Sequence, residues 1–358
     1  MKKVERVFEV VTVIYRLLIN KILGKKSILF FGVPTYGNVG DIAIALASES
    51  LIRENTKKGE LIIINDSISV ITARLIRWFV SSTDCIIFQG GGNMGSIYTG
   101  IESERESVFS QFSNIQMLKL QFPSSINFKE LRKKELARVQ SIYSDVEIFA
   151  REYVSFEKAK EMKLGKLHLS PDIVFFLADS TCRQDSRSNV AAEKIFKKVL
   201  IIRRNDEERL KNSAFDEIIK TIKSDNNLTV GFTDTVIELP SLSVRTDKKR
   251  KKIFQDKISE INKADIVLTD RLHGMILSLI SGVPVVAFDN STHKIQSTCK
   301  HWLSEYSNVY LHESEQSISL SKLKVWYSQT NGYPPNLKES FADLQKLVND
   351  RTESYEAK

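Results

Sequence analysis

Cysteine is scarce in this sequence, with only three among 358 residues. Cys85, Cys182 and Cys299 lie far apart, and no Cys-x-x-Cys pair occurs. A disulfide framework or a zinc ribbon does not fit this pattern, and a reducing cytoplasm is the expected compartment. The sequence also lacks a set of His, Cys, Asp and Glu residues with metal-ligand spacing, so we expect no metal site.

Long uninterrupted apolar runs are missing as well. Glu9, Arg16 and Asn20 interrupt the apolar stretch near the N-terminus, and no small-residue cleavage site follows it. This excludes a spanning helix and a signal peptide as interpretations of residues 1–25. Apolar residues recur there at helical spacing between basic flanks, at Val4, Val7, Val11, Ile14, Leu18 and Ile22. We predict an amphipathic helix that packs this face on the adjoining domain; the alternative is peripheral contact of residues 4–23 with an anionic membrane.

Acidic residues are in deficit, and the formal net charge is +8. Such a charge favours an anionic partner without specifying it. Helix-turn-helix, zinc-finger and RRM signatures are absent, so no nucleic-acid partner is expected. The densest basic run, DKKRKK at residues 247–252, is interpreted as a solvated loop or helix start.

Short apolar strands alternate with amphipathic helices along two stretches of the chain. The first stretch has predicted strands at 27–34, 61–66, 146–152 and 171–177, and 84–95 is a strand that runs into a glycine-rich turn. The second stretch has strands within 197–206, LTVGFTD, ADIVLTD and VPVVAFD. This alternation predicts parallel sheets covered on both faces. We therefore expect an α/β chain with two doubly wound domains facing a cleft. The expected divisions are an N-terminal helix (1–25), a first domain (26–180), a polar linker (181–196), a second domain (197–335) and a C-terminal helix (336–358).

Two glycine-rich turns follow predicted strands of the first domain. In open parallel sheets, ligands bind beyond the carboxyl ends of the strands, and glycine lets the backbone approach a ligand. Neither turn has the spacing of a dinucleotide fingerprint or a Walker A loop. Asp41 begins the helix after the first turn, where it is either a cap or a functional carboxylate. The candidate acceptor or loop contacts are Gly37, Asn38, Gly40, Gln89, Gly91, Gly92 and Asn93.

Basic residues stand at other predicted strand ends. Arg151 ends one strand, and Arg203 and Arg204 end another. A guanidinium matches carboxylate or phosphate with two parallel hydrogen bonds. In TDRLHG, Arg271 and His273 stand between a strand and a helix N-terminus, which is typical of an anion site that contains an acid.

Further motifs complete a family pattern. Lys294, beside His293 in DNSTHKI, follows the next strand. Together, YGNVGD, GGGN, the ARE strand end, SPDIVF, TDRLHG and HKI resemble the polysaccharide pyruvyl transferases, in the family's order and over nearly the whole chain after residue 25. The resemblance implies two Rossmann-like domains arranged as in glycosyltransferase-B enzymes. Matched by motif, Arg271, Leu272, His273, Lys294 and Arg151 fall on donor-site positions.

The resemblance also implies a chemistry: phosphoenolpyruvate as the donor co-substrate, no cofactor, and a sugar hydroxyl pair of a bacterial cell-surface glycan precursor as the acceptor. Arg271, Lys294 and one of Arg151, Arg203 and Arg204 would clamp the donor. His273 is the expected general acid and Asp41 the expected base. A lipid-linked acceptor would place the protein at the inner face of the membrane, and the oligomeric state, a homo-oligomer included, is left open.

Two alternatives remain at the level of sequence. One is a glycosyltransferase of the same architecture that uses a nucleotide sugar, because its basic cleft would have a similar sequence pattern. The other is a non-catalytic protein that binds glycans or anions with the same fold.

Overall fold

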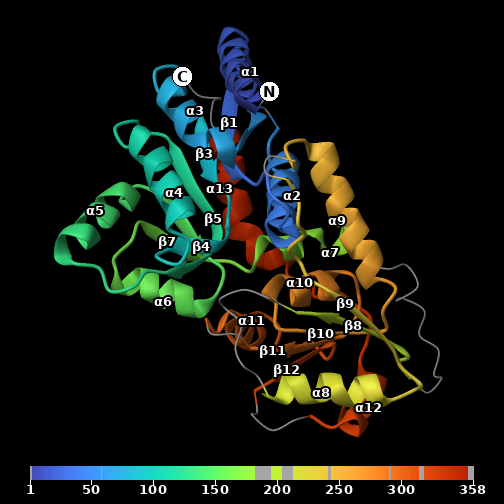
Figure 1. Cartoon of the computed structure of the whole chain (residues 1–358). Coiled ribbons are helices and arrows are strands. Elements are labelled where there is room, and N and C mark those ends of the chain that lie inside the picture. Colours follow the sequence, from blue (N-terminus) through green and yellow to red (C-terminus); the bar gives the residue numbers. More distant parts are fainter. Residues whose placement is uncertain are drawn as a thin grey trace.

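The computed structural model describes residues 2–57, 59–181, 195–203, 213–240, 243–289, 292–313 and 318–353. Two parallel sheets dominate it (Figure 1). The seven strands of the first sheet are β1 (Lys26–Val33), β2 (Gly59–Asn65), β3 (Cys85–Phe88), β4 (Gly91–Gly95), β5 (Leu118–Asn127), β6 (Glu147–Ala150) and β7 (Lys166–Leu169). The five strands of the second are β8 (Lys198–Ile202), β9 (Thr229–Thr233), β10 (Ile266–Thr269), β11 (Val285–Phe288) and β12 (Val309–His312).

The two sheets share one winding pattern. The first sheet has the order β2-β1-β3-β5-β6-β7, with β4 paired to β5, and the second has the order β12-β11-β10-β8-β9. In each sheet, the strand that comes first in the chain lies between the strands that come second and third. The order of the strands therefore reverses direction at this first strand. This is the doubly wound, Rossmann-like arrangement, and ligands bind at the reversal point beyond the strand ends. The predicted pair of doubly wound domains is confirmed.

Helices cover both faces of the sheets. Those of the first domain and its edges are α1 (Lys2–Ile22), α2 (Val39–Glu54), α3 (Ser69–Ile76), α4 (Thr99–Gln111), α5 (Lys133–Tyr143), α6 (Tyr153–Glu161) and α7 (Ala178–Thr181). Those of the second half are α8 (Ser213–Ser224), α9 (Asp247–Ile261), α10 (Leu272–Ile280), α11 (Lys294–Trp302), α12 (Leu320–Gln329) and α13 (Ala342–Glu353). Short 3-10 turns are η1 (Asp66–Ile68), η2 (Ile173–Leu177) and η4 (Lys338–Phe341). None of the described helices is long and apolar enough to cross a membrane.

One continuous core joins the two domains. It includes residues of β1 and α2 in the first domain, α9 and α10 in the second, and the returning α13. The predicted C-terminal helix thus packs back on the first domain, where α13 contacts α2. A buried ion pair crosses the same region, with Arg250 Nη2 3.2 Å from Glu49 Oε1. The basic run 247–252 is therefore the start of α9, and its single arginine, Arg250, is buried rather than solvated.

One strand prediction and one turn prediction were wrong. Within the predicted strand 171–177, Ile173–Leu177 form the 3-10 helix η2, because the Asp172 side chain accepts a hydrogen bond from the Val174 amide and caps a helical turn. The glycine-rich stretch after β3 is not simply a turn, since Gly91–Gly95 pairs with β5 as the short strand β4. Strands β5, β7 and β12 were not predicted. Most of the predicted linker, residues 182–194, lies outside the described residues.

The N-terminal helix forms as predicted but packs with a different face. Its buried residues are Val10, Val13, Leu17 and Asn20, whereas Val4, Val7, Val11, Leu18 and Ile22 of the predicted face are exposed. Both faces are apolar at helical spacing, so periodicity alone could not choose between them.

The packing of α1 gives a direct test. Leu17 is fully buried and Leu18 is 38% exposed. Leu17→Ala should lower the free energy of unfolding by about 2–4 kcal/mol, because it removes buried methyl groups and leaves a cavity. Leu18→Ala should lower it by less than about 1 kcal/mol. Urea unfolding of both variants measures this difference, and a larger loss for Leu18→Ala would contradict the described packing.

Candidate active site

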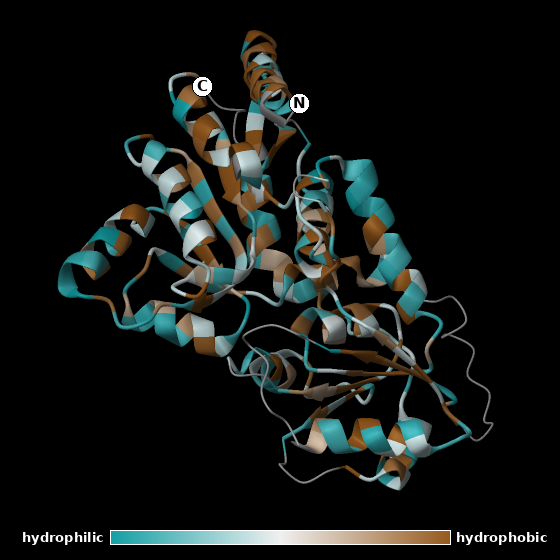
Figure 2. Cartoon of the chain, in the orientation of Figure 1, coloured by the Kyte–Doolittle hydropathy of each residue, from teal (hydrophilic) through white to brown (hydrophobic). Residues whose placement is uncertain are grey.

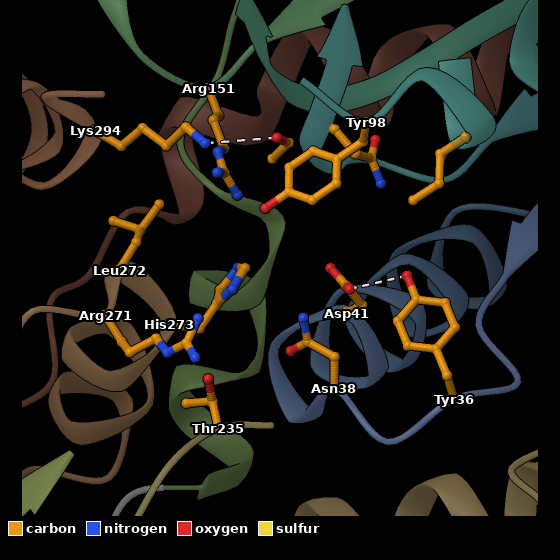
Figure 3. Close-up of a pocket in the computed structure, with 13 residues that line it drawn as sticks. Tyr36, Asn38, Asp41, Tyr98, Arg151, Thr235, Arg271, Leu272, His273 and Lys294 are labelled. Atoms are coloured by element: carbon orange, nitrogen blue, oxygen red, sulfur yellow. Dashed lines mark hydrogen bonds between the residues drawn. The ribbon is translucent and has the colours of Figure 1, made fainter. Parts of the chain in front are cut away.

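A cavity of about 310 Å³ opens between the carboxyl ends of the strands of the two sheets. This volume falls in the range of small-molecule sites. Both domains contribute to the lining, which consists of Tyr36, Asn38, Asp41, Gly92, Asn93, Tyr98, Ile101, Arg151, Thr235, Arg271, Leu272, His273 and Lys294. In Figure 3 the acidic and phenolic groups stand on one side, with the imidazole and the cations facing them.

Asp41 lies on the first-domain wall. The side chain of Asn38 accepts a hydrogen bond from the Gly40 amide and caps α2, which places Asp41 in the first turn. The Tyr36 hydroxyl donates to Asp41 Oδ2 at 2.9 Å. Burial raises the pKa of Asp41, although His273, the Tyr36 hydrogen bond and Arg151 each act to lower it. A carboxylate with a raised pKa is a better proton acceptor than an ordinary aspartate.

His273 is held by a carboxylate from the other domain. It lies in the first turn of α10, and its Nε2 is 3.3 Å from Oδ2 of Asp172, which precedes η2. Burial alone would raise the pKa of Asp172, but the neighbouring Arg151 and His273 hold that pKa well below its usual range. Asp172 therefore stays charged, and its carboxylate lies where it can orient the His273 ring. From the sequence alone, Asp270 of TDRLHG could either orient this histidine or cap the helix; the structure places Asp172 beside it.

Arg151 and Lys294 meet at Gly92. Arg151 Nη1 donates to Asp172 Oδ2 at 2.6 Å, and its Nε donates to Ser125 Oγ at 2.9 Å. Lys294 Nζ donates to the Gly92 carbonyl at 3.5 Å. A Cβ added to Gly92 would lie 3.1 Å from Arg151 Nη2 and 3.3 Å from Lys294 Nζ. Two cations from different domains thus converge on one backbone position, which is the arrangement that an anion needs.

Arg271 is already engaged by a carboxylate. Its Nε and Nη2 donate to the two carboxylate oxygens of Asp234, each at 2.8 Å. The sequence predicted a cationic clamp at this position, and the guanidinium does line the cavity. Its charge, however, is largely balanced by Asp234, so Arg271 is fixed in orientation rather than available as an isolated charge.

Several predicted contact residues lie outside the cavity lining and help to hold the lining residues in place. A Cβ on Gly40 would lie 2.2 Å from His273 Nδ1, so only glycine lets α2 approach the imidazole so closely. The Gly37 carbonyl accepts from the Ile237 amide at 2.7 Å, which joins the two domains. Gln89 Nε2 donates to the Asp41 carbonyl at 3.2 Å. Gly37, Gly40, Gln89 and Gly91 are not among the lining residues.

Arg203, one of the two arginines predicted at the end of the 197–206 strand, is not brought into the cavity. Arg203 Nη2 lies 2.6 Å from Asp216 Oδ1, and its guanidinium stacks on Phe215. It does not line the cavity, and Arg204 lies outside the described residues. Of the three arginine candidates for the donor, the structure brings Arg151 to the site.

Sequence reasoning missed six residues of the site. Tyr36, Tyr98, Ile101 and Thr235 line the cavity, and Asp172 and Asp234 hold its basic groups. Only two carried a usable signal: Tyr36 stands inside the glycine-rich turn, and Asp172 inside SPDIVF. In the described part of the chain, no cluster of three or more His, Cys, Asp or Glu residues is suited to a metal ion.

Comparison with known proteins gives consistent results. A model of the polysaccharide pyruvyl transferase family matches residues 38–292. General stress protein 30 of Bacillus subtilis is 30% identical, over 90% of this chain and 91% of its own. Pyruvyl transferase 1 of Schizosaccharomyces pombe is 26% identical, over 81% of this chain and 71% of its own.

A solved structure from Listeria monocytogenes, assigned as a UDP-N-acetylglucosamine 2-epimerase, superposes with a TM-score of 0.55. It is 11% identical and covers 92% of this chain and 97% of its own. At this identity the likeness concerns the fold alone, which is glycosyltransferase-B-like.

The two aspartates of the cavity should affect stability in opposite directions. Asp41 has a raised pKa, so its ionisation destabilises the folded state above the ordinary carboxyl range, and Asp41→Asn should stabilise the protein at pH 7 by about 1 kcal/mol. Asp172 has a lowered pKa, so it contributes stability that is present above the ordinary carboxyl pKa and is lost as pH falls through its folded value. Asp172→Asn should cost about 3 kcal/mol at pH 7, because it weakens the compensation of buried Arg151.

Chemical denaturation of the two variants at pH 7 provides the measurement. Equal destabilisation by both changes would contradict the assigned environments.

Proposed function

This chain belongs to the polysaccharide pyruvyl transferase family and is a transferase, and we propose that it joins the pyruvyl group of phosphoenolpyruvate to two hydroxyl groups of a sugar as a ketal, releasing phosphate. One observation carries the proposal. The cavity sets a cationic corner at Arg151 and Lys294 beside His273, and opposes it with Asp41, a buried carboxylate of raised pKa. The cationic corner can hold a small dianionic donor, and Asp41 can accept a proton from an alcohol.

The donor needs two anchors, because it carries a phosphate and a carboxylate. Arg151 and Lys294 converge at Gly92 and supply one, and Arg271, held rigid by Asp234, supplies the other. Since Asp172 and Asp234 already balance much of this charge, the clamps act mainly by orientation and by stabilising charge that develops during the reaction.

The reaction begins with protonation of the donor's methylene carbon. His273, oriented by Asp172, gives its proton to that carbon, which becomes a methyl group. The adjacent carbon is then electrophilic, and the first sugar hydroxyl bonds to it while Asp41 takes the hydroxyl proton. The bond from this carbon to the phosphate oxygen breaks, phosphate leaves, and the second hydroxyl closes the ring. Its proton and the one on Asp41 restore His273 and protonate the phosphate.

The acceptor in this proposal is the precursor of a bacterial surface polysaccharide. Asn38, Asn93, Tyr98 and Thr235 line the cavity and offer the amide and hydroxyl groups that bind sugar hydroxyls. We further propose that the acceptor is lipid-linked and is modified in the cytoplasm, at the inner face of the membrane.

His273→Ala should abolish acceptor-dependent phosphate release from phosphoenolpyruvate, because it removes the proton donor. Donor binding, followed as the shift that phosphoenolpyruvate causes in the melting temperature, should stay within a few-fold, since Arg151 and Lys294 are unchanged. The matched control is His293→Ala: the side chain of this histidine is 66% exposed, makes no capping hydrogen bond to α11 and does not line the cavity. It should retain turnover.

Retained turnover in His273→Ala would exclude His273 as the acid while leaving the reaction intact. Wild-type protein that releases no phosphate with extracted lipid-linked sugar precursors, and whose melting temperature responds to UDP-sugars but not to phosphoenolpyruvate, would overturn the proposed reaction.

Tyr36→Phe should move the acidic limb of kcat/KM against pH to higher pH. The Tyr36 hydroxyl donates to Asp41, and this hydrogen bond favours the ionised carboxylate. Its removal raises the pKa of Asp41 further. Tyr153→Phe, at a half-exposed tyrosine outside the cavity, is the control and should leave the limb in place. A limb that moves to lower pH, or not at all, would remove Asp41 as the base.

A further inference from the structure

Helix α1 has two apolar faces. One packs on the first domain through Val10, Val13 and Leu17. The opposite face has a regular alternation of three- and four-residue steps, at Val4, Phe8, Val11, Tyr15, Leu18 and Ile22. A helix that merely covers a sheet has a polar outer face. Here all six outer residues are exposed, from 38% at Leu18 to 80% at Ile22.

The neighbouring helix extends this apolar area. Helix α3 packs beside α1, and Ile71, Leu75, Trp78 and Phe79, on and just after α3, are exposed as well. Trp78 is 75% exposed, which is unusual for the largest apolar side chain. These four residues and the six of the outer face of α1 define the α1–α3 surface. Figure 2 shows α1 hydrophobic along much of its visible length, at the end of the molecule away from the second domain.

Basic residues surround the α1–α3 surface. Arg6, Lys21, Lys25, Arg74 and Arg77 are all exposed there, and the Arg77 guanidinium lies 4.4 Å from the centroid of the Trp78 ring.

The acidic residues beside this rim have basic partners. Glu5 pairs with Arg245 at 2.6 Å, and Asp84 lies 3.9 Å from Lys21. The charge around the apolar area is therefore net positive, and the Trp78 ring lies beside one of these charges, the Arg77 guanidinium.

We propose that the α1–α3 surface docks on an anionic lipid membrane, with its apolar residues in the boundary between headgroups and acyl chains. An amphipathic helix with aromatic and aliphatic residues on one side and basic residues at the edges binds such membranes in the interface plane. Each basic residue near an anionic leaflet adds to the attraction. A second copy of the chain fits less well, because two identical surfaces would bring their positive rims together. The proposal stands apart from the chemistry of the cavity.

Vesicle binding tests it directly. The full chain is mixed with vesicles of equal parts phosphatidylcholine and phosphatidylglycerol, or of phosphatidylcholine alone, and bound protein is measured by flotation. Wild type should bind the anionic vesicles and bind the neutral ones at least several-fold more weakly. The triple change Phe8→Glu, Val11→Glu and Trp78→Glu should weaken anionic binding about tenfold or more, because it puts charge into the inserted face.

The matched control carries the same added charge elsewhere. Ile195→Glu, Phe232→Glu and Val325→Glu alter residues outside the first domain that are each more than half exposed. This variant should bind within about twofold of wild type. Lys25→Gln with Arg74→Gln provides a milder change to the rim, and should reduce binding several-fold and more so at low salt.

Three results would overturn the proposal. The first is wild type that binds neither vesicle, and the second is equal binding by wild type and both surface variants. The third is a wild-type dimer by light scattering that dissociates in the triple variant without any vesicle binding, since a second copy would then cover the surface. Circular dichroism melts of all variants show whether they fold.

Discussion

The cleft depends on a buried chain of charges that runs from Arg151 through Asp172 to His273. Arg151 and Asp172 are each 2% exposed, and the two belong to one domain while His273 belongs to the other. Removing either partner of such a buried pair leaves an uncompensated charge, which is among the most destabilising single changes. Asp172 has Arg151 and His273 as partners, one from each domain, and this double contact fixes the first domain against α10. The same contact holds the imidazole in place at the wall of the cavity, so stability and the proposed chemistry rest on one contact.

This chain of charges also shows why the sequence overstated the basic character of the site. Arg271, Lys294 and one of three further arginines were expected to be available to a dianion. In the structure Arg271 is paired to Asp234, Arg203 to Asp216, and Arg151 to Asp172. Pairing lowers the net charge but fixes each guanidinium in one orientation, which an isolated surface arginine lacks. A paired arginine contributes less to attracting any anion and more to selecting one whose oxygens match its geometry.

The site residues that could be predicted from the sequence are those that stand close after a predicted strand. Parallel strands bring their carboxyl ends to one edge, so Asp41, Asn93, Arg151, Arg271, His273 and Lys294 could be placed together without coordinates. What failed depended on partners distant in sequence. Asp172 was hidden in an apolar stretch interpreted as a strand, although a capped helical turn there is what delivers its carboxylate to the cleft. Thr235 follows β9 and Tyr98 precedes α4, and neither stands in a motif that marks it as a site residue. The packing face of α1 was undecidable from periodicity, because both faces satisfy it.

Residues 243–246 link the α1–α3 surface to the cleft through an ion pair and hydrogen bonds. Arg245 pairs with Glu5 of α1, its carbonyl accepts from Arg250 of α9, and the adjacent Val244 amide donates to the Thr35 carbonyl, next to Tyr36. The N-terminal end of α1 is thus tied to the turn that carries the Asp41 hydrogen-bond donor. A protein held to a membrane by a loosely attached helix would present its active site in many orientations. Here α1 is packed on the first domain from Val10 to Asn20, so docking through its outer face would fix the direction of the cleft relative to the bilayer. A fixed direction favours an acceptor whose sugar stands at a set distance from the membrane, because each encounter then begins near the reactive geometry.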